Sequence, residues 1–114
     1  MAIDAFIAKL NTAPDTIQFS DTIAIIDSHY EFTPSAFQNG KIKNELGQNS
    51  GSCKLFSFAK LQGLTESQTL SCFGDYYRMD VLQHPEAQDH QNIRNFIQYG
   101  WPGISFERDA LRKK

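Results

Sequence analysis

The sequence is poor in cysteine and has no long apolar run. Cys53 and Cys72 are too few for a disulfide scaffold, and we expect both to be free thiols in a reducing cytoplasm. No stretch approaches the roughly 20 apolar residues that cross a bilayer. The opening residues also lack the basic and apolar regions of a secretory signal. We therefore expect a cytoplasmic protein without a membrane partner.

The sequence also lacks an excess of charge of one sign. Eleven Lys and Arg residues stand against 13 Asp and Glu, which gives a net charge of −2. Nucleic-acid binding usually requires a basic surface, so we expect no nucleic-acid partner. The one basic run, Arg112-Lys113-Lys114, is interpreted as the solvated end of a helix.

Metal and nucleotide signatures are missing as well. His84 and His90 are six residues apart, which is not the i, i+4 spacing that presents two ligands on one helix face. The loop 47–51 lacks the Gly-Lys-Ser/Thr ending of a phosphate-binding loop. We therefore expect neither a metal nor a cofactor.

Core-forming residues are plentiful. The chain has 114 residues, of which 40% are hydrophobic and nine are Phe. At this length about two thirds of the unfolded surface can be buried, which is enough for one core. No stretch resembles a linker, so residues 1–114 are predicted to form a single globular domain.

Three helices are predicted in the first half of the chain. Ile3, Phe6, Ile7 and Leu10 follow the i, i+3, i+4, i+7 spacing of an amphipathic helix. Ser20-Asp21 is expected to cap a second helix. Ser52 is expected to cap a third, which runs from Cys53 to about Gln62 and stops at Gly63.

Two more helices are predicted in the second half. Thr65 and Gln68 form a capping box for a fourth helix, with Leu70, Phe73 and Tyr77 in a core stripe. Asp89 is expected to cap a fifth helix that ends at Gly100. The residues expected to bury the face of this fifth helix are Ile93, Phe96 and Ile97.

The segment between the second and third helices predicts a β-hairpin. Asn39 and Gly40 tolerate positive φ and lie between two short strand-like segments, 36–38 and 41–43. Residues 103–107 could add a strand to this hairpin. The predicted fold is therefore a helix-dominated α+β domain with about five helices and a short antiparallel β element.

The densest polar cluster runs from Asp75 to Asn95. Its concentration of hydrogen-bonding and aromatic groups is typical of recognition surfaces. Helical phasing turns Tyr77 toward the core and leaves Tyr76 exposed, and it places His90 at the rim of the apolar face of its helix. The candidate binding residues are Asp75, Tyr76, Arg78, His84, Asn92, Arg94 and Asn95.

Two other interpretations of this region stay open. Cys53, at a predicted helix N-terminus, could be a thiolate nucleophile with His90 as its base, which would make the protein a thiol-dependent hydrolase or transferase. Alternatively, the cluster is architectural: Asp89 caps a helix, and Asp75 and Arg78 form an ordinary surface ion pair. Cys72 has no activating neighbour and is interpreted as core.

Four strings, together spread over much of the chain, resemble the HopJ type III effector family. They are Pro34–Gly40, Gly51–Lys54, Cys72–Arg78 and Asp89–Phe96, and the resemblance extends from Phe6 to Phe106. It implies a bacterial protein that a type III secretion system could deliver into a host cell, and it implies no particular reaction. We therefore expect a small binding module whose partner is a protein or a small molecule.

Overall fold

The computed structural model describes residues 2–114, which form five α-helices, a π-helix, two 3-10 helices and five short strands. The elements are α1 (Ile3–Thr12), η1 (Pro14–Thr16), α2 (Phe19–His29), β1 (Tyr30–Phe32), β2 (Phe37–Asn39), β3 (Ile42–Asn44), α3 (Ser50–Gln62), α4 (Glu66–Ser71), η2 (Tyr76–Val81), α5 (Gln91–Tyr99), η3 (Trp101–Gly103), β4 (Ile104–Phe106) and β5 (Leu111–Lys113). Among these residues, no helix has the length and apolar character needed to cross a membrane.

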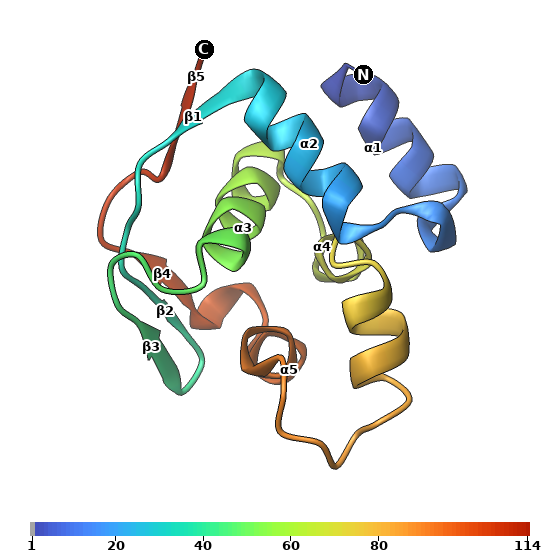
Figure 1. Ribbon diagram of the computed structural model, residues 1–114, viewed down its shortest axis with the longest axis vertical. Helices are drawn as coiled ribbons and strands as arrows, with labels where there is room; N and C mark the ends of the chain where they lie inside the picture. The colour runs from blue at the N-terminus through green and yellow to red at the C-terminus, as the bar shows by residue number, and fades with distance from the viewer. Residues whose placement is uncertain (1) are drawn as a thin grey trace.

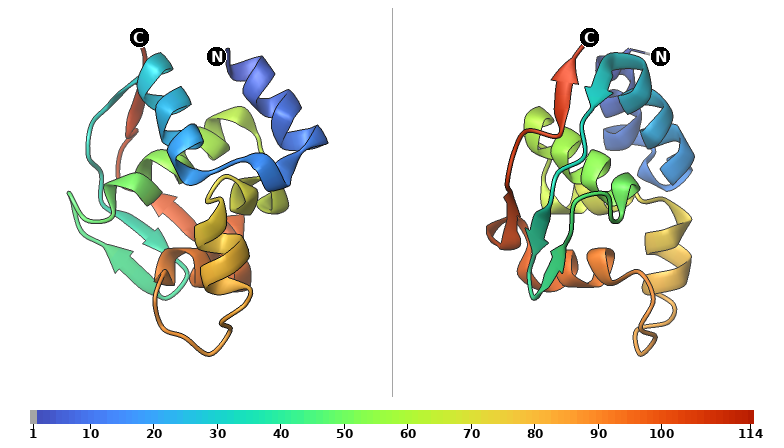
Figure 2. Two further views of the ribbon diagram at one scale, coloured as in Figure 1. Left: turned by 45° about the vertical axis from the view of Figure 1, so that its right-hand side comes forward. Right: turned by 60° about the vertical axis from the view of Figure 1, so that its left-hand side comes forward.

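Helix α3 is the centre of the core. Leu55, Phe56, Phe58 and Ala59 are all 0% exposed, so the helix is apolar around most of its circumference, as a helix enclosed by other elements must be. Figures 1 and 2 show α1 and α2 above it on one side, with the strands and α5 on the others. The predicted helix-dominated α+β fold is confirmed.

The predicted hairpin is confirmed, with its turn displaced by one residue. Asn39 pairs with Ile42, so the two central residues of the turn are Gly40 and Lys41 rather than Asn39 and Gly40. Gly40 has a φ of +61°, the conformation that glycine adopts without strain. The predicted third strand is also present, because β4 pairs antiparallel with β2 and makes the sheet order β3-β2-β4.

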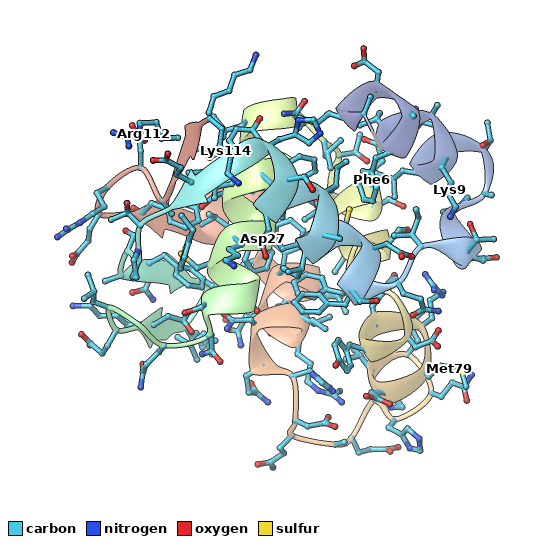
Figure 3. All side chains as sticks on the ribbon, turned by 45° about the horizontal axis from the view of Figure 1, so that its top comes forward. Phe6, Lys9, Asp27, Met79, Arg112 and Lys114 are labelled. Carbon is cyan, nitrogen blue, oxygen red and sulfur yellow. The ribbon has the colours of Figure 1, made fainter. Side chains whose placement is uncertain are left out.

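The interpretation of the basic C-terminus as a helix end was wrong. Residues Leu111–Lys113 form β5, which pairs antiparallel with β1 in a separate two-stranded sheet. Arg112 forms an ion pair with Glu31 on the partner strand, and the last backbone N–H, of Lys114, donates to the carbonyl of His29. Figure 3 shows Lys114 lying beside Asp27, whose carbonyl accepts from its ammonium at 2.8 Å.

Helix ends were predicted with mixed success. Gly63 adopts the left-handed conformation after α3, and the Thr65–Gln68 capping box precedes α4, both as expected. Helix α2 begins earlier than predicted: Gln18 caps it and exchanges hydrogen bonds with Asp21 in a capping box. Helix α3 also begins earlier, at Ser50.

The predicted fourth helix is divided in two. Helix α4 ends at Ser71, and the chain turns at Gly74 (φ +64°) before continuing as the π-helix η2. Leu70 and Phe73 are buried and Tyr77 is half-buried, so the predicted core stripe survives the break. The turn brings Gly74 so close to Gln18 and Phe19 that a Cβ would lie 2.7 Å from their backbone atoms.

Gly74 and Gly63 provide a matched pair for separating backbone strain from steric clash. Both have positive φ, but nothing lies within 4 Å of a Cβ built on Gly63. We expect Gly63→Ala to lower the free energy of unfolding by about 1 kcal/mol, through strain alone. Gly74→Ala should cost about 3 kcal/mol or more, because rigid backbone must also move. Urea denaturation of both variants checks this, and equal losses would contradict it.

Candidate functional site

A cleft of about 360 Å³ opens where the first turns of α3 and α5 meet. Helix α3 contributes its N-terminal residues, α5 contributes its own, and η2 and the start of α2 supply aromatic rings. The residues that line the cleft are Phe19, Ile42, Asn49, Gly51, Ser52, Phe73, Tyr76, His90, Gln91, Asn92 and Ile93.

Both helices begin at this cleft without a side-chain cap. The residues before their first turns, Asn49 and His90, have left-handed backbones with φ of 50° and 51°. The first backbone N–H groups of an α-helix have no partner within the helix, and the helix dipole makes this end electropositive. The expected cap at Asp89 was wrong: His90 occupies the cap position, and its side chain makes no capping hydrogen bond.

Tyr76 and His90, two of the predicted site residues, meet on the wall of the cleft. Their ring centroids are 5.2 Å apart, and the Tyr76 ring also lies 5.4 Å from Phe19. His90 Nε2 lies 3.0 Å from Asp80 Oδ2, which fixes the plane of the imidazole. Tyr76 is exposed and Tyr77 is half-buried, as helical phasing predicted.

Asn92 reaches the cleft but is mainly a structural residue. It is only 7% exposed, and its Oδ1 accepts from Nδ2 of Asn39 and of Asn44, both at 3.0 Å. Its own Nδ2 donates to Asn44 Oδ1 at 3.0 Å. Asn49 joins the same network through Asn44. We call Asn39, Asn44, Asn49 and Asn92 the asparagine network; it ties the β2–β3 hairpin to the first turns of both helices.

Asn95 has a comparable role one turn later in α5. Its Oδ1 accepts from the backbone N–H of Lys41 at 3.2 Å, and its Nδ2 donates to the Gln91 carbonyl at 2.9 Å. The side chain is buried against the hairpin turn and does not line the cleft.

The Arg78 side chain binds the segment that precedes α2. Its guanidinium donates to the carbonyls of Pro14 (3.2 Å) and Ile17 (2.7 Å). The expected ion pair with Asp75 is present at 3.4 Å, the longest of these contacts. Asp75 is exposed, so the pair adds little to stability.

Arg94 holds the loop between η2 and α5. It donates to the carbonyl of Asp89 at 2.6 Å and to that of Asp80 at 3.3 Å, and it forms an ion pair with the Asp89 carboxylate at 2.8 Å. This hydrogen bond from Arg94 lowers the pKa of Asp89. Asp89 is therefore a partner of Arg94 rather than a helix cap.

His84 lies apart from the other candidates. It is exposed in the loop 82–90 and does not line the cleft. Within residues 2–114, the structure contains no group of three His, Cys, Asp or Glu side chains arranged to hold a metal ion.

Cys53 does not have the surroundings of an activated thiol. It is 1% exposed, its thiol faces the Ser35 carbonyl at 3.7 Å, and its backbone N–H donates to Asn49 within the helix. Burial raises the pKa of the Cys53 thiol, the opposite of what a thiolate nucleophile requires. Cys72 is core, as interpreted, and burial raises its pKa to about 12.

Several cleft residues were not among the sequence candidates. Phe19, Ile42 and Asn49 come from elements far from the 75–95 cluster, and no local pattern marks them as site residues. A side chain would not fit at Gly51, because a Cβ there would lie 2.7 Å from the Phe19 ring. Ile97, expected to be buried, is 47% exposed. Its helix turns that position toward solvent.

Comparison with known proteins places the chain among relatives of the same fold. The sequence model described as HopJ type III effector protein matches residues 3–111. The crystal structure of VPA0580, a protein of unknown function, is similar over 100% of this chain and 95% of that one, with 50% sequence identity and a TM-score of 0.98. No curated protein matches the chain.

Both cysteines should react slowly in the native protein. At pH 8 we expect iodoacetamide to label Cys53 and Cys72 at least about tenfold more slowly in the folded than in the urea-unfolded chain, because burial blocks access and raises both pKa values. Mass spectrometry gives the rates, and a Ser20→Cys variant, with its thiol at an exposed position, is the positive control. Rapid native labelling of Cys53 would contradict this.

The asparagine network should stabilise the fold. Asn92→Ala leaves buried amide groups of Asn39 and Asn44 with fewer partners, so the free energy of unfolding should fall by about 2 to 4 kcal/mol. Gln91→Ala, the adjacent exposed position, should change it by less than about 0.5 kcal/mol. Chemical denaturation measures both. An Asn92→Ala variant as stable as the parent would show that the network is dispensable.

Proposed function

The chain belongs to the HopJ type III effector family, and we propose that it is a small binding module whose ligand occupies the cleft between α3 and α5. The ligand is a small molecule, or the tip of a protein partner, that carries an anionic group. In keeping with the family, the module acts in the bacterial cytoplasm or in a host cell reached by type III secretion.

The convergence of two uncapped helix N-termini on one cleft carries this proposal. Residues of the first turns of α3 and α5 line it together, and the first N–H groups of each helix have no partner within the helix, at the positive end of its dipole. Such ends bind carboxylates and phosphates readily. Two of them at one opening favour a negatively charged ligand over a neutral or cationic one.

The rest of the cleft supports a ligand with a flat apolar part. Phe19, Phe73 and Tyr76 line one side, and Tyr76 packs on His90. Because Asp80 occupies His90 Nε2, the second ring nitrogen, Nδ1, is without a partner among residues 2–114 and is available to a ligand. Aromatic rings beside a few fixed polar groups are the usual composition of a small-molecule site.

Arg78 and Arg94 support the cleft instead of contacting the ligand. Each guanidinium donates to backbone carbonyls that hold neighbouring segments in place. Tyr76, His90 and the first turns of α3 and α5 are the groups left to recognise a ligand.

A set of probes that share one ring tests the charge preference. We expect benzoate to shift the backbone amide NMR signals of Ser50–Ser52 and Gln91–Ile93, with benzyl alcohol weaker and benzylamine without effect at these amides. His90→Gln should weaken benzoate binding at least about threefold, through loss of the ring contact and of Nδ1. His84→Gln, an identical change at an exposed histidine outside the cleft, should leave it unchanged.

Two results would overturn the proposal. One is equal binding of benzylamine and benzoate, which would remove the role of the helix N-termini. The other is a benzoate footprint confined to residues outside the cleft.

A further inference from the structure

A second and larger cleft, of about 540 Å³, lies on another face of the protein. It is formed by the C-terminal half of α3 and by the segment that connects β4 to β5. It shares no lining residue with the first cleft. The residues that line it are Ser57, Lys60, Leu61, Phe106, Glu107, Arg108, Asp109, Ala110 and Leu111.

The first observation concerns the buried hydroxyl group of Ser57. The residue is 8% exposed, and its Oγ makes no hydrogen bond of ordinary geometry; the Cys53 thiol, one turn earlier on α3, interacts with it only weakly. Buried hydroxyl groups are almost always hydrogen-bonded, because leaving one unpaired is unfavourable. Ser57 shares a face of α3 with Lys60 and Leu61, three and four residues further on, and all three line the cleft.

The charges around the cleft provide the second observation. The ammonium of Lys60 lies 6.0 Å from the centroid of the Phe106 ring, which holds it against the cleft wall. The segment between β4 and β5 adds Glu107, Arg108 and Asp109 to the lining, and within residues 2–114 these three side chains form no ion pair. The cleft therefore offers charged groups of both signs that form no ion pair among residues 2–114.

The remaining surface of the cleft is apolar. Leu61 is 59% exposed, and Leu111 and Ala110 are buried beneath the opening. Exposed leucine beside buried aliphatic groups suits an apolar side chain of a ligand.

We propose that this cleft binds a zwitterionic α-amino acid with an apolar side chain. The carboxylate pairs with Lys60 and accepts a hydrogen bond from Ser57 Oγ. The ammonium faces Glu107 and Asp109, and the side chain packs on Leu61 and Leu111. Solvent does not reach the Ser57 oxygen in this conformation, so binding includes a rotamer change in an adjacent lining side chain.

Three probes that differ only in their charged groups test this assignment. L-Phenylalanine has both charges, 3-phenylpropanoate lacks the ammonium, and 2-phenylethylamine lacks the carboxylate. We expect L-phenylalanine to shift the NMR signals of Ser57, Lys60 and Leu61 and to bind about tenfold more tightly than either analogue. Affinities are read from the signals of Ser57, Lys60 and Leu61 alone, because the α3–α5 cleft is itself proposed to bind aryl carboxylates. Equal binding of one analogue at these three residues, or no shift of their signals, would overturn the proposal.

Ser57→Ala separates a ligand contact from a structural role. We expect it to weaken L-phenylalanine binding about tenfold while the melting temperature stays the same or rises, because an unpaired hydroxyl is removed from a helix and alanine favours helices. Ser71→Ala, on α4 and outside both clefts, should leave binding unchanged. Unaltered binding by Ser57→Ala would remove Ser57 from the site. Because the two clefts share no residue, this outcome is independent of the benzoate experiment.

Discussion

The amide groups of the asparagine network hold together the parts of the molecule that form the α3–α5 cleft. Asn92 is the centre: it accepts from two hairpin asparagines and donates to one of them. These bonds fix the hairpin against the start of α5, and Asn49 extends them to the start of α3. A buried network of this kind stabilises one arrangement only when nearly all of its members are paired. The placement of the two helix N-termini therefore depends on side chains that themselves face mostly inward.

Arg78 and Arg94 likewise fix segments of the chain that lie outside the helices and strands. Arg78 binds carbonyls before α2, and Arg94 binds carbonyls in the loop before α5. A planar guanidinium with five donors suits this task better than an ammonium does. The cluster between Asp75 and Asn95 consequently contains two kinds of residue. Arg78, Arg94 and Asn95 hold the frame, while Tyr76 and His90 face the cleft.

Sequence reasoning performed best where the determining contacts are local. The Thr65–Gln68 box and the stop at Gly63 depend on neighbours a few residues away, and both are present. The strand β5 could not be predicted, because its basic residues pair with β1 some 80 positions earlier by register (Tyr30 with Lys113). The break at Gly74 was missed for the same reason, since it depends on contact with Gln18.

In the candidate site, too, features set by local sequence were predicted and features set by distant contacts were not. Helical phasing, a local property, predicted that Tyr76 is exposed, and it is. His90 lines the cleft, but it does so from the position before α5 and not from a face of that helix. The structural roles of Arg78 and Asn92 were invisible, because their partners lie 48 to 64 residues away in sequence. Residue type and helix position indicate an activated thiol only where the thiol is accessible, and tertiary packing buries that of Cys53.

The hairpin turn has a consequence for the chemical durability of the protein. In an Asn-Gly sequence the glycine nitrogen can attack the preceding side-chain amide, releasing ammonia and converting the asparagine into an aspartate or its iso form. Here the Gly40 nitrogen donates to the Gly103 carbonyl at 3.0 Å, and the Asn39 amide is wholly buried with its nitrogen held by Asn92. In the native fold, therefore, neither the Gly40 nitrogen nor the Asn39 amide is free to react. A chain that stays unfolded long enough would acquire a carboxylate at position 39 of the asparagine network, and refolding would not reverse the damage.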